Sequence, residues 1–288
     1  YEGVEFPIVV TFEIYEKEGY MAEYLLHELH RTNNREDYPD LTDEEFANFR
    51  EVTTPGMGDD TLYRSSSPIN PELGRNTYAD AAMEAAGIKT VINLADSETS
   101  AAAYPGFADT YYSQQRVLYL NLGVDFAAAD FQEGLANGLR FMAANEGPYM
   151  VHCTEGKDRA GFVNALLECF MGATYEEVVA DYMVTYYNYY GVEPGTDKYN
   201  AIADSNIVKS LKNAFGVEDL TTADLAAEAE EYLRTIGLGA QEVADLYVAL
   251  GGEIAVSDDI IILYTNDVHT YIDKDLSYDN LADLKVKL

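Results

Sequence analysis

The stretch that most constrains the fold is PYMVHCTEGKDRAGFVNALLECFMG, residues 148–172. A short apolar run ends at His152 and Cys153, a polar turn containing Gly156 follows, and an apolar helical pattern begins near Arg159. A short, continuously apolar strand is typical of a sheet that is buried on both faces. A strand that turns directly into a helix therefore favours an α/β architecture.

The same alternation of strand and helix precedes this stretch. Strands are predicted at residues 61–68, 88–95 and 117–122, and helices at residues 77–87 and 130–147, with Asp130 as the N-cap of the second. Strands that alternate with helices pack into a mostly parallel central sheet flanked by helices. We therefore expect an α/β fold of this kind.

Residues typical of helix ends indicate where several helices begin or stop. Thr42 with Glu45, and Thr174 with Glu177, have the spacing of a capping box, and Gly87 is suited to end a helix. After residue 172 the pattern is only helical, so we expect extra C-terminal helices, at residues 174–191, 197–216, 221–237 and 240–252.

The ends of the chain suggest three parts. Residues 4–16 alternate as a strand does but have no hairpin partner nearby, so residues 1–16 are predicted to be the remnant of an upstream module. Residues 17–252 form the main domain. Residues 253–288 are predicted to be a linker and the first strand of a second, truncated domain.

The charge of the chain excludes some partners. Its 18 basic and 51 acidic residues give a formal net charge of −33, which argues against nucleic acid and anionic membrane surfaces. No apolar run is long enough to span a bilayer, so an integral membrane protein is not expected. An anionic substrate would have to be attracted by local positive groups.

The turn after Cys153 supplies such groups. A reactive cysteine needs positive potential, because the thiolate is the nucleophile. The N-terminus of the helix near Arg159, the backbone N–H groups of residues 154–159 and the side chains of Lys157 and Arg159 all provide it. Gly156 permits the backbone conformation that such a turn requires. These features would also bind a phosphate dianion.

The motif His152-Cys153-x-x-Gly156-x-x-Arg159 resembles the signature of the cysteine-dependent phosphatases. The segments ANFREV, LYRSSSP, GIKTVINLAD and HCTEGKDRAG also occur in the order found in the bacterial tyrosine-phosphatase-like family, which includes tyrosine and phosphoinositide phosphatases. The resemblance covers about residues 45–250 and implies a cysteine-phosphatase-like fold.

The resemblance also implies a mechanism that needs no cofactor and no metal. Cys153 would form a phosphocysteine that water then hydrolyses, and His152 would hold the loop by hydrogen bonds. Arg159 and the loop amides would stabilise the phosphoryl oxygens. The phosphate would therefore be bound by the loop residues Thr154, Glu155, Gly156 and Lys157.

Two aspartates qualify as the general acid. Asp158 is preferred, because the loop resembles that of the myotubularin-type lipid phosphatases, in which the Asp before the Arg is the proposed acid. Asp125 follows a predicted strand, where many of these enzymes carry a mobile loop with the acid. Either carboxylate could instead cap a helix or form a salt bridge.

Two residues depart from the family pattern. Ala160 stands where the family usually has Ser or Thr, so the second step is expected to be slow and phosphocysteine to accumulate. Glu155 places a negative charge in a loop that binds anions, and its side chain is expected to point outward.

The substrate is predicted to be a phosphotyrosine peptide, a phosphoinositide or an inositol phosphate. Lys157 resembles the loop lysine of the phosphoinositide-cleaving members. The tyrosines of residues 185–191 could flank a phenyl phosphate or simply pack in the core. Arg64 could border the pocket or form a structural ion pair.

Two alternatives to a phosphatase stay open. A sulfurtransferase of the rhodanese kind also uses a cysteine loop beside a helix. A catalytically weak module that binds phosphorylated ligands would fit Ala160.

Other candidate sites have less support in the sequence. His27 and His30 could share a metal face, but a third ligand is lacking, and Cys169 lies in an apolar helix as a core thiol would. Residues 258–269 resemble the opening of exported metallophosphoesterases of the 5′-nucleotidase type, with Asp267 and His269 at metal-ligand positions. Two ligands cannot build a two-metal site, so no metal function is predicted.

This second resemblance also bears on location and assembly. It implies a longer, exported or cell-surface bacterial parent protein. The terminal strand offers an exposed edge through which a homodimer could form.

Overall fold

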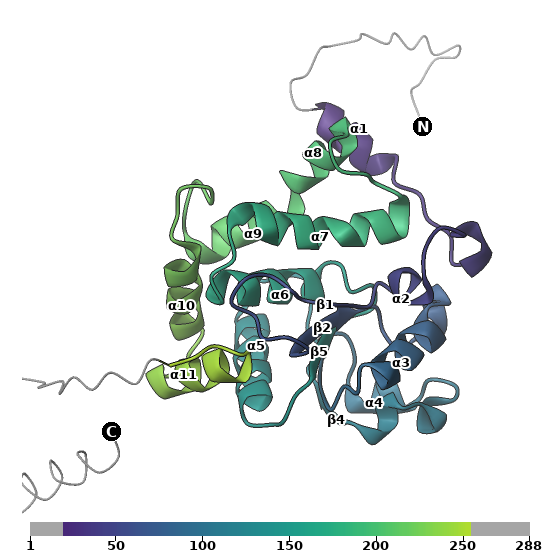
Figure 1. Cartoon of the computed structure of the whole chain (residues 1–288), viewed down its shortest axis with the longest axis horizontal. Coiled ribbons are helices and arrows are strands. Elements are labelled where there is room, and N and C mark those ends of the chain that lie inside the picture. The colour runs from purple at the N-terminus through teal and green to yellow at the C-terminus, as the bar shows by residue number, and fades with distance from the viewer. Residues whose placement is uncertain (1–19, 255–288) are drawn as a thin grey trace, which may run out of the picture. The chain divides into compact units, whose positions relative to one another are not determined.

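The computed structural model describes residues 20–254, in which strands and helices alternate as predicted (Figure 1). The strands are β1 (Arg50–Glu51), β2 (Leu62–Ser65), β3 (Thr90–Asn93), β4 (Arg116–Tyr119) and β5 (Tyr149–His152). The α-helices are α1 (Tyr20–His27), α2 (Asp43–Phe46), α3 (Asn76–Ala85), α4 (Glu98–Ala102), α5 (Ala129–Ala143), α6 (Arg159–Phe170), α7 (Tyr175–Tyr190), α8 (Asp197–Ala203), α9 (Asn206–Phe215), α10 (Leu225–Thr235) and α11 (Ala240–Ala249). Short 3-10 helices lie at Arg35–Asp37, Pro71–Leu73, Phe107–Asp109 and Tyr112–Gln114.

The strands form one sheet in the order β1-β2-β5-β3-β4. Strands β2, β5, β3 and β4 run parallel, and β1 pairs antiparallel with β2 at one edge. The mostly parallel sheet predicted from the sequence is therefore confirmed. The short antiparallel strand β1 was not predicted.

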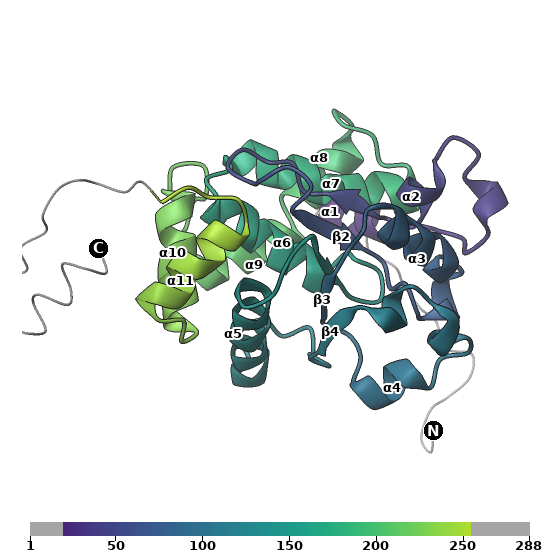
Figure 2. The ribbon, with the colours of Figure 1, turned by 60° about the horizontal axis from the view of Figure 1, so that its bottom comes forward.

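Both faces of the sheet are buried. Alternate residues along a strand point to opposite faces. Ile92 and Val151 accordingly join the hydrophobic core that contains α5 and α6, and Val91 and Met150 join the core that contains α3. Figure 2 shows α5 on one side of β3 and β4, with α3 and α4 on the other. This two-sided burial explains why the strands are apolar without alternation.

Helix α6 lies at the centre of the larger core. It packs against β5, α7, α9 and α10, and every one of its residues after Arg159 is buried. A helix surrounded by neighbours does not need a polar face, which explains the apolar sequence of this segment. The helix that follows the cysteine loop is thus held on several sides.

Most of the predicted helix boundaries are correct. Both capping boxes form, so Thr42 and Thr174 begin α2 and α7, and Gly87 follows α3 with a φ of 63°. The prediction for Asp130 is wrong: α5 begins at Ala129, and the Asp130 carboxylate accepts a hydrogen bond from its neighbour's N–H. Residues 197–216 form two helices, α8 and α9, instead of one.

Several predictions fall outside the described residues. These are the strands at residues 4–16 and 258–269, the metal-ligand positions Asp267 and His269, and the dimer through a terminal strand. Between residues 20 and 254, no helix has both the length and the apolar character needed to cross a bilayer.

Candidate active site

The candidate active site is the loop of residues 153–158, which joins β5 to α6. Strand β5 lies between the parallel strands β2 and β3, and Cys153 follows its last residue. The carboxyl ends of parallel strands are where α/β proteins place their ligands. Cys153 is 3% exposed, and Arg159 is the first residue of α6.

Four consecutive carbonyl groups of this loop accept hydrogen bonds from donors outside it. His152 lies beside the Cys153 carbonyl, with Nδ1 at 3.3 Å, and the Ser67 N–H donates to the Thr154 carbonyl at 3.1 Å. The Glu155 carbonyl accepts from Asn48 Nδ2 at 3.1 Å and from the Tyr189 hydroxyl at 2.8 Å. The Gly156 carbonyl accepts from Arg64 Nη2 at 3.0 Å.

The N–H groups of the loop are left free by this arrangement. In the described part of the chain, the N–H groups of residues 154–158 donate to no protein acceptor. When the carbonyls of a tight loop are bound on one side, its N–H groups can converge on the other and form an anion-binding nest. The N-terminus of α6 adds the positive end of its dipole to the same place.

Gly156 is required by the path of the loop. Its φ is +69°, a conformation that residues with a side chain rarely adopt. A Cβ atom at this position would also lie 2.3 Å from the Ser65 carbonyl oxygen. Both the conformation and the close approach to β2 therefore favour glycine here.

Arg159 is anchored on one side, and within residues 20–254 its Nε is unpaired on the other. Its Nη1 donates to the Leu122 carbonyl at 2.9 Å, and its Nη2 reaches Thr154 Oγ1 at 3.3 Å. Its Nε is buried and has no hydrogen-bond partner among the described residues. The Nε and Nη2 edge of the guanidinium is therefore suited to two oxygens of a tetrahedral anion.

His152 connects the loop to a buried chain of hydrogen bonds. A carbonyl can only accept, so Nδ1 of His152 carries the proton that faces the Cys153 oxygen, and Nε2 accepts from the Tyr112 hydroxyl at 2.9 Å. Burial lowers the pKa of His152 to about 4. The imidazole is thus neutral at physiological pH and holds the loop without transferring protons.

The chain of hydrogen bonds continues beyond Tyr112. Asn93 Nδ2 donates to the Tyr112 hydroxyl at 3.0 Å and to Asp96 at 3.1 Å, and the Tyr104 hydroxyl donates to the other oxygen of Asp96. Asn93 is the last residue of β3. The end of the neighbouring strand therefore fixes the orientation of His152.

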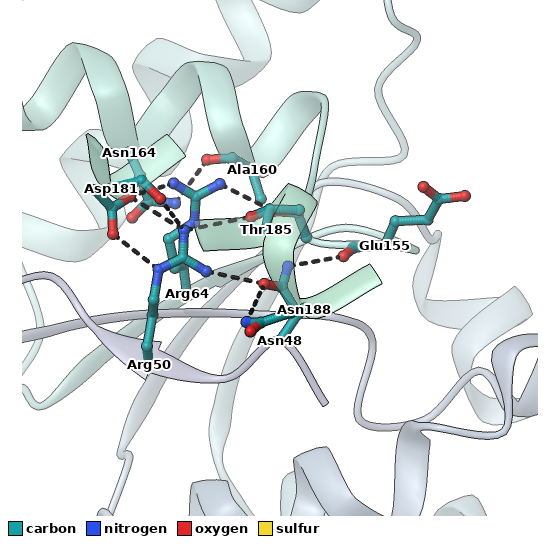
Figure 3. A network of polar contacts seen from close by, with 10 residues as sticks. Asn48, Arg50, Arg64, Glu155, Ala160, Asn164, Asp181, Thr185 and Asn188 are labelled. Atoms are coloured by element: carbon teal, nitrogen blue, oxygen red, sulfur yellow. Dashed lines mark hydrogen bonds and ion pairs between the residues drawn. The ribbon is translucent and has the colours of Figure 1, made fainter. Parts of the chain in front are cut away.

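Arg64 lies close to Asp181 and Arg50, as Figure 3 shows. It is fully buried, and its Nη1 lies 2.5 Å from Asp181 of α7, whose carboxylate also binds Arg50 at 2.8 Å. The two arginines hold the pKa of Asp181 well below its usual range, against the effect of burial. Of the two alternatives for Arg64, the structural ion pair is confirmed and a place at the pocket wall is not, because the fully buried side chain binds Asp181 and the Gly156 carbonyl.

Asn48 has a comparable supporting role that the sequence did not reveal. Its φ is 53°, and its side-chain oxygen accepts hydrogen bonds from Arg50 and Asn188 while its amide binds the loop (Figure 3). Ser67, Tyr112 and Tyr189 also hold the loop without having been predicted. The quoted segments ANFREV and LYRSSSP contain Asn48 and Ser67, but no spacing rule singles them out.

The Glu155 carboxylate is paired with two cations. It lies 2.7 Å from Arg31 Nη1 and 2.9 Å from Lys157 Nζ, and the side chain is 22% exposed. Against the effect of burial, these cations lower the pKa of Glu155. The negative charge of the loop is therefore neutralised on its outer side.

The two candidate acids differ in position. Asp158 occupies the N-cap position of α6 but makes no capping hydrogen bond, and its nearest cation is Lys157 at 3.9 Å. Partial burial raises the pKa of Asp158, although its side chain is 48% exposed and Lys157 and Arg159 oppose the shift. Asp125 is exposed and accepts a hydrogen bond from the Ala127 N–H at 3.1 Å. Asp158 thus lies in the loop, and Asp125 stabilises a local turn.

Ala160, the tyrosine-rich segment and the two histidines of residues 27–30 all lie outside the loop. Ala160 is fully buried, in the same core cluster as Cys153. Tyr186 and Tyr189 are buried, which confirms the packing interpretation for these two rings of the tyrosine-rich segment. Among residues 20–254, no cluster of three or more His, Cys, Asp or Glu side chains could hold a metal, and His27 and His30 are both exposed.

Known proteins match this chain in sequence and, partly, in structure. Residues 41–250 match the tyrosine phosphatase family. A tyrosine-protein phosphatase of Nostoc commune is 25% identical over 223 residues, which are 62% of this chain and 72% of that protein.

Two solved structures show a partial likeness. The first is P. aeruginosa TpbA in complex with pTyr, with a TM-score of 0.35 and 19% identity over 72% of this chain and 91% of that one. The second is the core catalytic domain of the PP-IP phosphatase Siw14 from S. cerevisiae. It has a TM-score of 0.35 and 17% identity, and the match covers 60% of this chain and 95% of that one. The chain belongs to the tyrosine phosphatase family, which confirms the resemblance seen in the sequence.

Proposed function

We propose that this chain hydrolyses phosphomonoesters with Cys153 as the nucleophile. The observation that carries the proposal is the arrangement around Cys153 among the residues that the structure describes: free loop N–H groups, the N-terminus of α6 and the unpaired Nε of Arg159. Such donors can stabilise both a thiolate and the equatorial oxygens of a phosphoryl group in transfer. Membership of the tyrosine phosphatase family supports the same reaction.

The reaction would proceed in two steps. The Cys153 thiolate attacks phosphorus, the bond to the leaving oxygen breaks, and Asp158 gives that oxygen a proton. Water then attacks the phosphocysteine, Asp158 takes a proton from it, and the phosphorus–sulfur bond breaks to release inorganic phosphate. Arg159 and the loop amides hold the phosphoryl oxygens throughout.

Phosphotyrosine is the substrate that we favour. The Nostoc commune relative is named a tyrosine-protein phosphatase, and four tyrosines line a cavity beside the loop, among them Tyr187 and Tyr190. Aromatic rings flanking the loop can pack against the ring of an aryl phosphate. Phosphoinositides and inositol phosphates are the second candidate, because Lys157 lies in the loop.

The test is hydrolysis of an aryl phosphate in EDTA by the wild-type protein and by Cys153→Ser. We expect activity that resists EDTA and is lost in the variant, because serine is a far weaker nucleophile than a thiolate. Retention of activity in Cys153→Ser would contradict the proposal. Turnover of thiosulfate would indicate a sulfurtransferase, and binding of phosphotyrosine without turnover would indicate a binding module.

A further inference from the structure

Glu155 forms ion pairs with two cations beside the loop. Arg31 approaches from the segment after α1, and Lys157 lies two residues further along the loop itself. All three side chains are largely buried, with exposed fractions of 23% for Arg31, 22% for Glu155 and 17% for Lys157. Interactions between charges at such sites are screened less by salt than those of fully exposed pairs.

The pairing is reinforced by neighbouring groups. The Lys157 ammonium donates to the Tyr190 hydroxyl at 3.4 Å, and the Arg31 guanidinium lies over the Tyr189 ring at 5.2 Å. The Tyr189 hydroxyl in turn binds the Glu155 carbonyl. Glu155 is therefore fixed both through its backbone and through its carboxylate.

A cavity of about 450 Å³ adjoins these groups. Arg31, Tyr189 and Tyr190 contribute to its wall, so it begins where the Glu155 ion pairs lie. The wall also contains Asp37, Asp40 and Glu193. With Arg31 neutralised by Glu155, the charge of this wall is more negative than positive.

We propose that Glu155 determines substrate selectivity by withholding Lys157 and Arg31 from a second phosphate. This role of Glu155 rests on the function proposed above. It means that the preferred substrate carries a single phosphate, as a phosphotyrosine peptide does. A phosphoinositide with two neighbouring phosphates is disfavoured, because its second phosphate meets cations that are already paired with Glu155. Glu155 is thus a specificity-determining residue that acts through its two partners.

The test compares two soluble phosphoinositides on the same scaffold, one with a single phosphate on the inositol ring and one with two neighbouring phosphates. The ratio of kcat/KM, bisphosphate over monophosphate, is measured for the wild-type protein and for Glu155→Gln. We expect the variant to raise this ratio about tenfold, mainly through a lower KM for the bisphosphate, as one freed cation at short range would do.

Two further variants show whether the change in the ratio is specific to the ion pairs of Glu155. Glu193→Gln removes the same charge from the wall of the adjoining cavity, but Glu193 forms no ion pair within residues 20–254, so its ratio should stay near that of the wild type. Adding Lys157→Gln to Glu155→Gln should remove most of the gain. A ratio unchanged in Glu155→Gln, or raised equally in Glu193→Gln, would overturn the inference.

Binding of the same two lipids is also measured in a Cys153→Ser background. The ratio of the two dissociation constants should shift in the same direction, and an unchanged ratio would count against the role of Glu155. Absence of turnover by the wild-type protein would instead count against the proposed phosphatase reaction. The two failures are thereby distinguished.

Discussion

At the scale of single residues, the site depends on which groups of each residue are bound and which are left free. The loop carbonyls are occupied while the N–H groups of residues 154–158 lack protein acceptors in the described region. Arg159 is likewise bound at one end only, because its Nη1 donates to the Leu122 carbonyl while its Nε has no hydrogen-bond partner in the described region. The chemistry around Cys153 therefore depends on residues that never touch a substrate.

The first prediction at this scale concerns the general acid. Asp158→Asn should lower kcat by about 100-fold for phosphates with poor leaving groups and spare aryl phosphates, because only a poor leaving group needs the proton. Its raised pKa would keep Asp158 protonated to a higher pH than an ordinary aspartate. The descending alkaline limb of the pH profile should therefore be lost in the variant.

Asp125→Asn is the matched control for this prediction. Asp125 is exposed and bonded to its own turn, so the substitution should leave the dependence on leaving group unchanged. If Asp125→Asn shows the loss and Asp158→Asn does not, the assignment must be reversed.

The second prediction concerns Ala160. Without a hydroxyl at this position, breakdown of the phosphocysteine is expected to limit turnover, giving a burst of product followed by a slower steady rate. Ala160→Ser should raise the steady-state kcat by about tenfold, equivalent to roughly 1.4 kcal/mol of barrier. Rapid-mixing kinetics would measure both phases, and an unchanged burst would contradict the interpretation.

At the scale of elements, the ends of strands and helices hold the loop in place. Strand β3 ends in Asn93, which orients His152 through Tyr112, and β2 carries Arg64, which supports Gly156. Helix α7 provides Asp181, the carboxylate that pairs with Arg64. The loop is short, but three separate elements determine its conformation.

One prediction tests the close approach of the loop to β2. Gly156→Ala introduces strain from its positive φ and a Cβ that would lie 2.3 Å from the Ser65 carbonyl oxygen. Thermal unfolding should show a loss well above the 1–2 kcal/mol typical of the conformation alone, and activity should be lost with it.

Gly191→Ala is the control, because Gly191 also has a positive φ, of 62°, but nothing lies within 4 Å of its Cβ position. It should cost about 1 kcal/mol and leave turnover unchanged. Equal losses in the two variants would show that the contact with β2 is unimportant.

A further prediction concerns Glu168 of α6, which is fully buried and whose carboxylate oxygens have no hydrogen-bond partner among residues 20–254. Burial and Asp181 raise the pKa of Glu168 well above its ordinary value, against the effect of Arg64 and Arg50. A raised folded-state pKa means that stability is lost as pH rises above about 4.3, the unfolded value.

Glu168→Gln should therefore increase the free energy of unfolding by about 1–3 kcal/mol at pH 7, with a smaller gain at pH 4. Denaturant unfolding at the two pH values measures both gains. A gain that is larger at pH 4 would show that the carboxylate is ionised in the folded protein.

At the scale of the whole molecule, an anion site operates within a chain of net charge −33. The cations near the loop share carboxylates, since Arg64 and Arg50 both pair with Asp181 and Lys157 and Arg31 both pair with Glu155. Phosphate binding then depends on backbone dipoles and Arg159 rather than on a basic surface. An exported or cell-surface location stays a prediction.

This charge predicts the effect of salt. A phosphate dianion is repelled by the overall field, so NaCl should raise kcat/KM for an aryl phosphate by about twofold to threefold between 0.02 and 0.3 M. Steady-state kinetics at several NaCl concentrations would measure it. A fall in kcat/KM with salt would mean that local cations outweigh the net charge.

The order of the residues is enough to predict the α/β architecture, the cysteine loop and the family. Apolar strands, capping boxes and the spacing of Cys153 to Arg159 are local patterns, and local patterns are written directly in the order of residues. The same reasoning placed Asp158 in the loop and Gly156 at its bend. It could not show which way Arg64 and Glu155 point.

The way in which the loop is held depends on contacts between elements that are distant in the sequence. Asn48, Ser67, Tyr112 and Tyr189 are far from Cys153 in the sequence, and they meet the loop because β2, β3 and α7 pack around β5 and α6. Hydrogen bonds and ion pairs between distant residues depend on direction and on distances of about 3 Å, which composition and spacing do not encode. The fold therefore turned Glu155 from an exposed charge into a partner of Lys157 and Arg31.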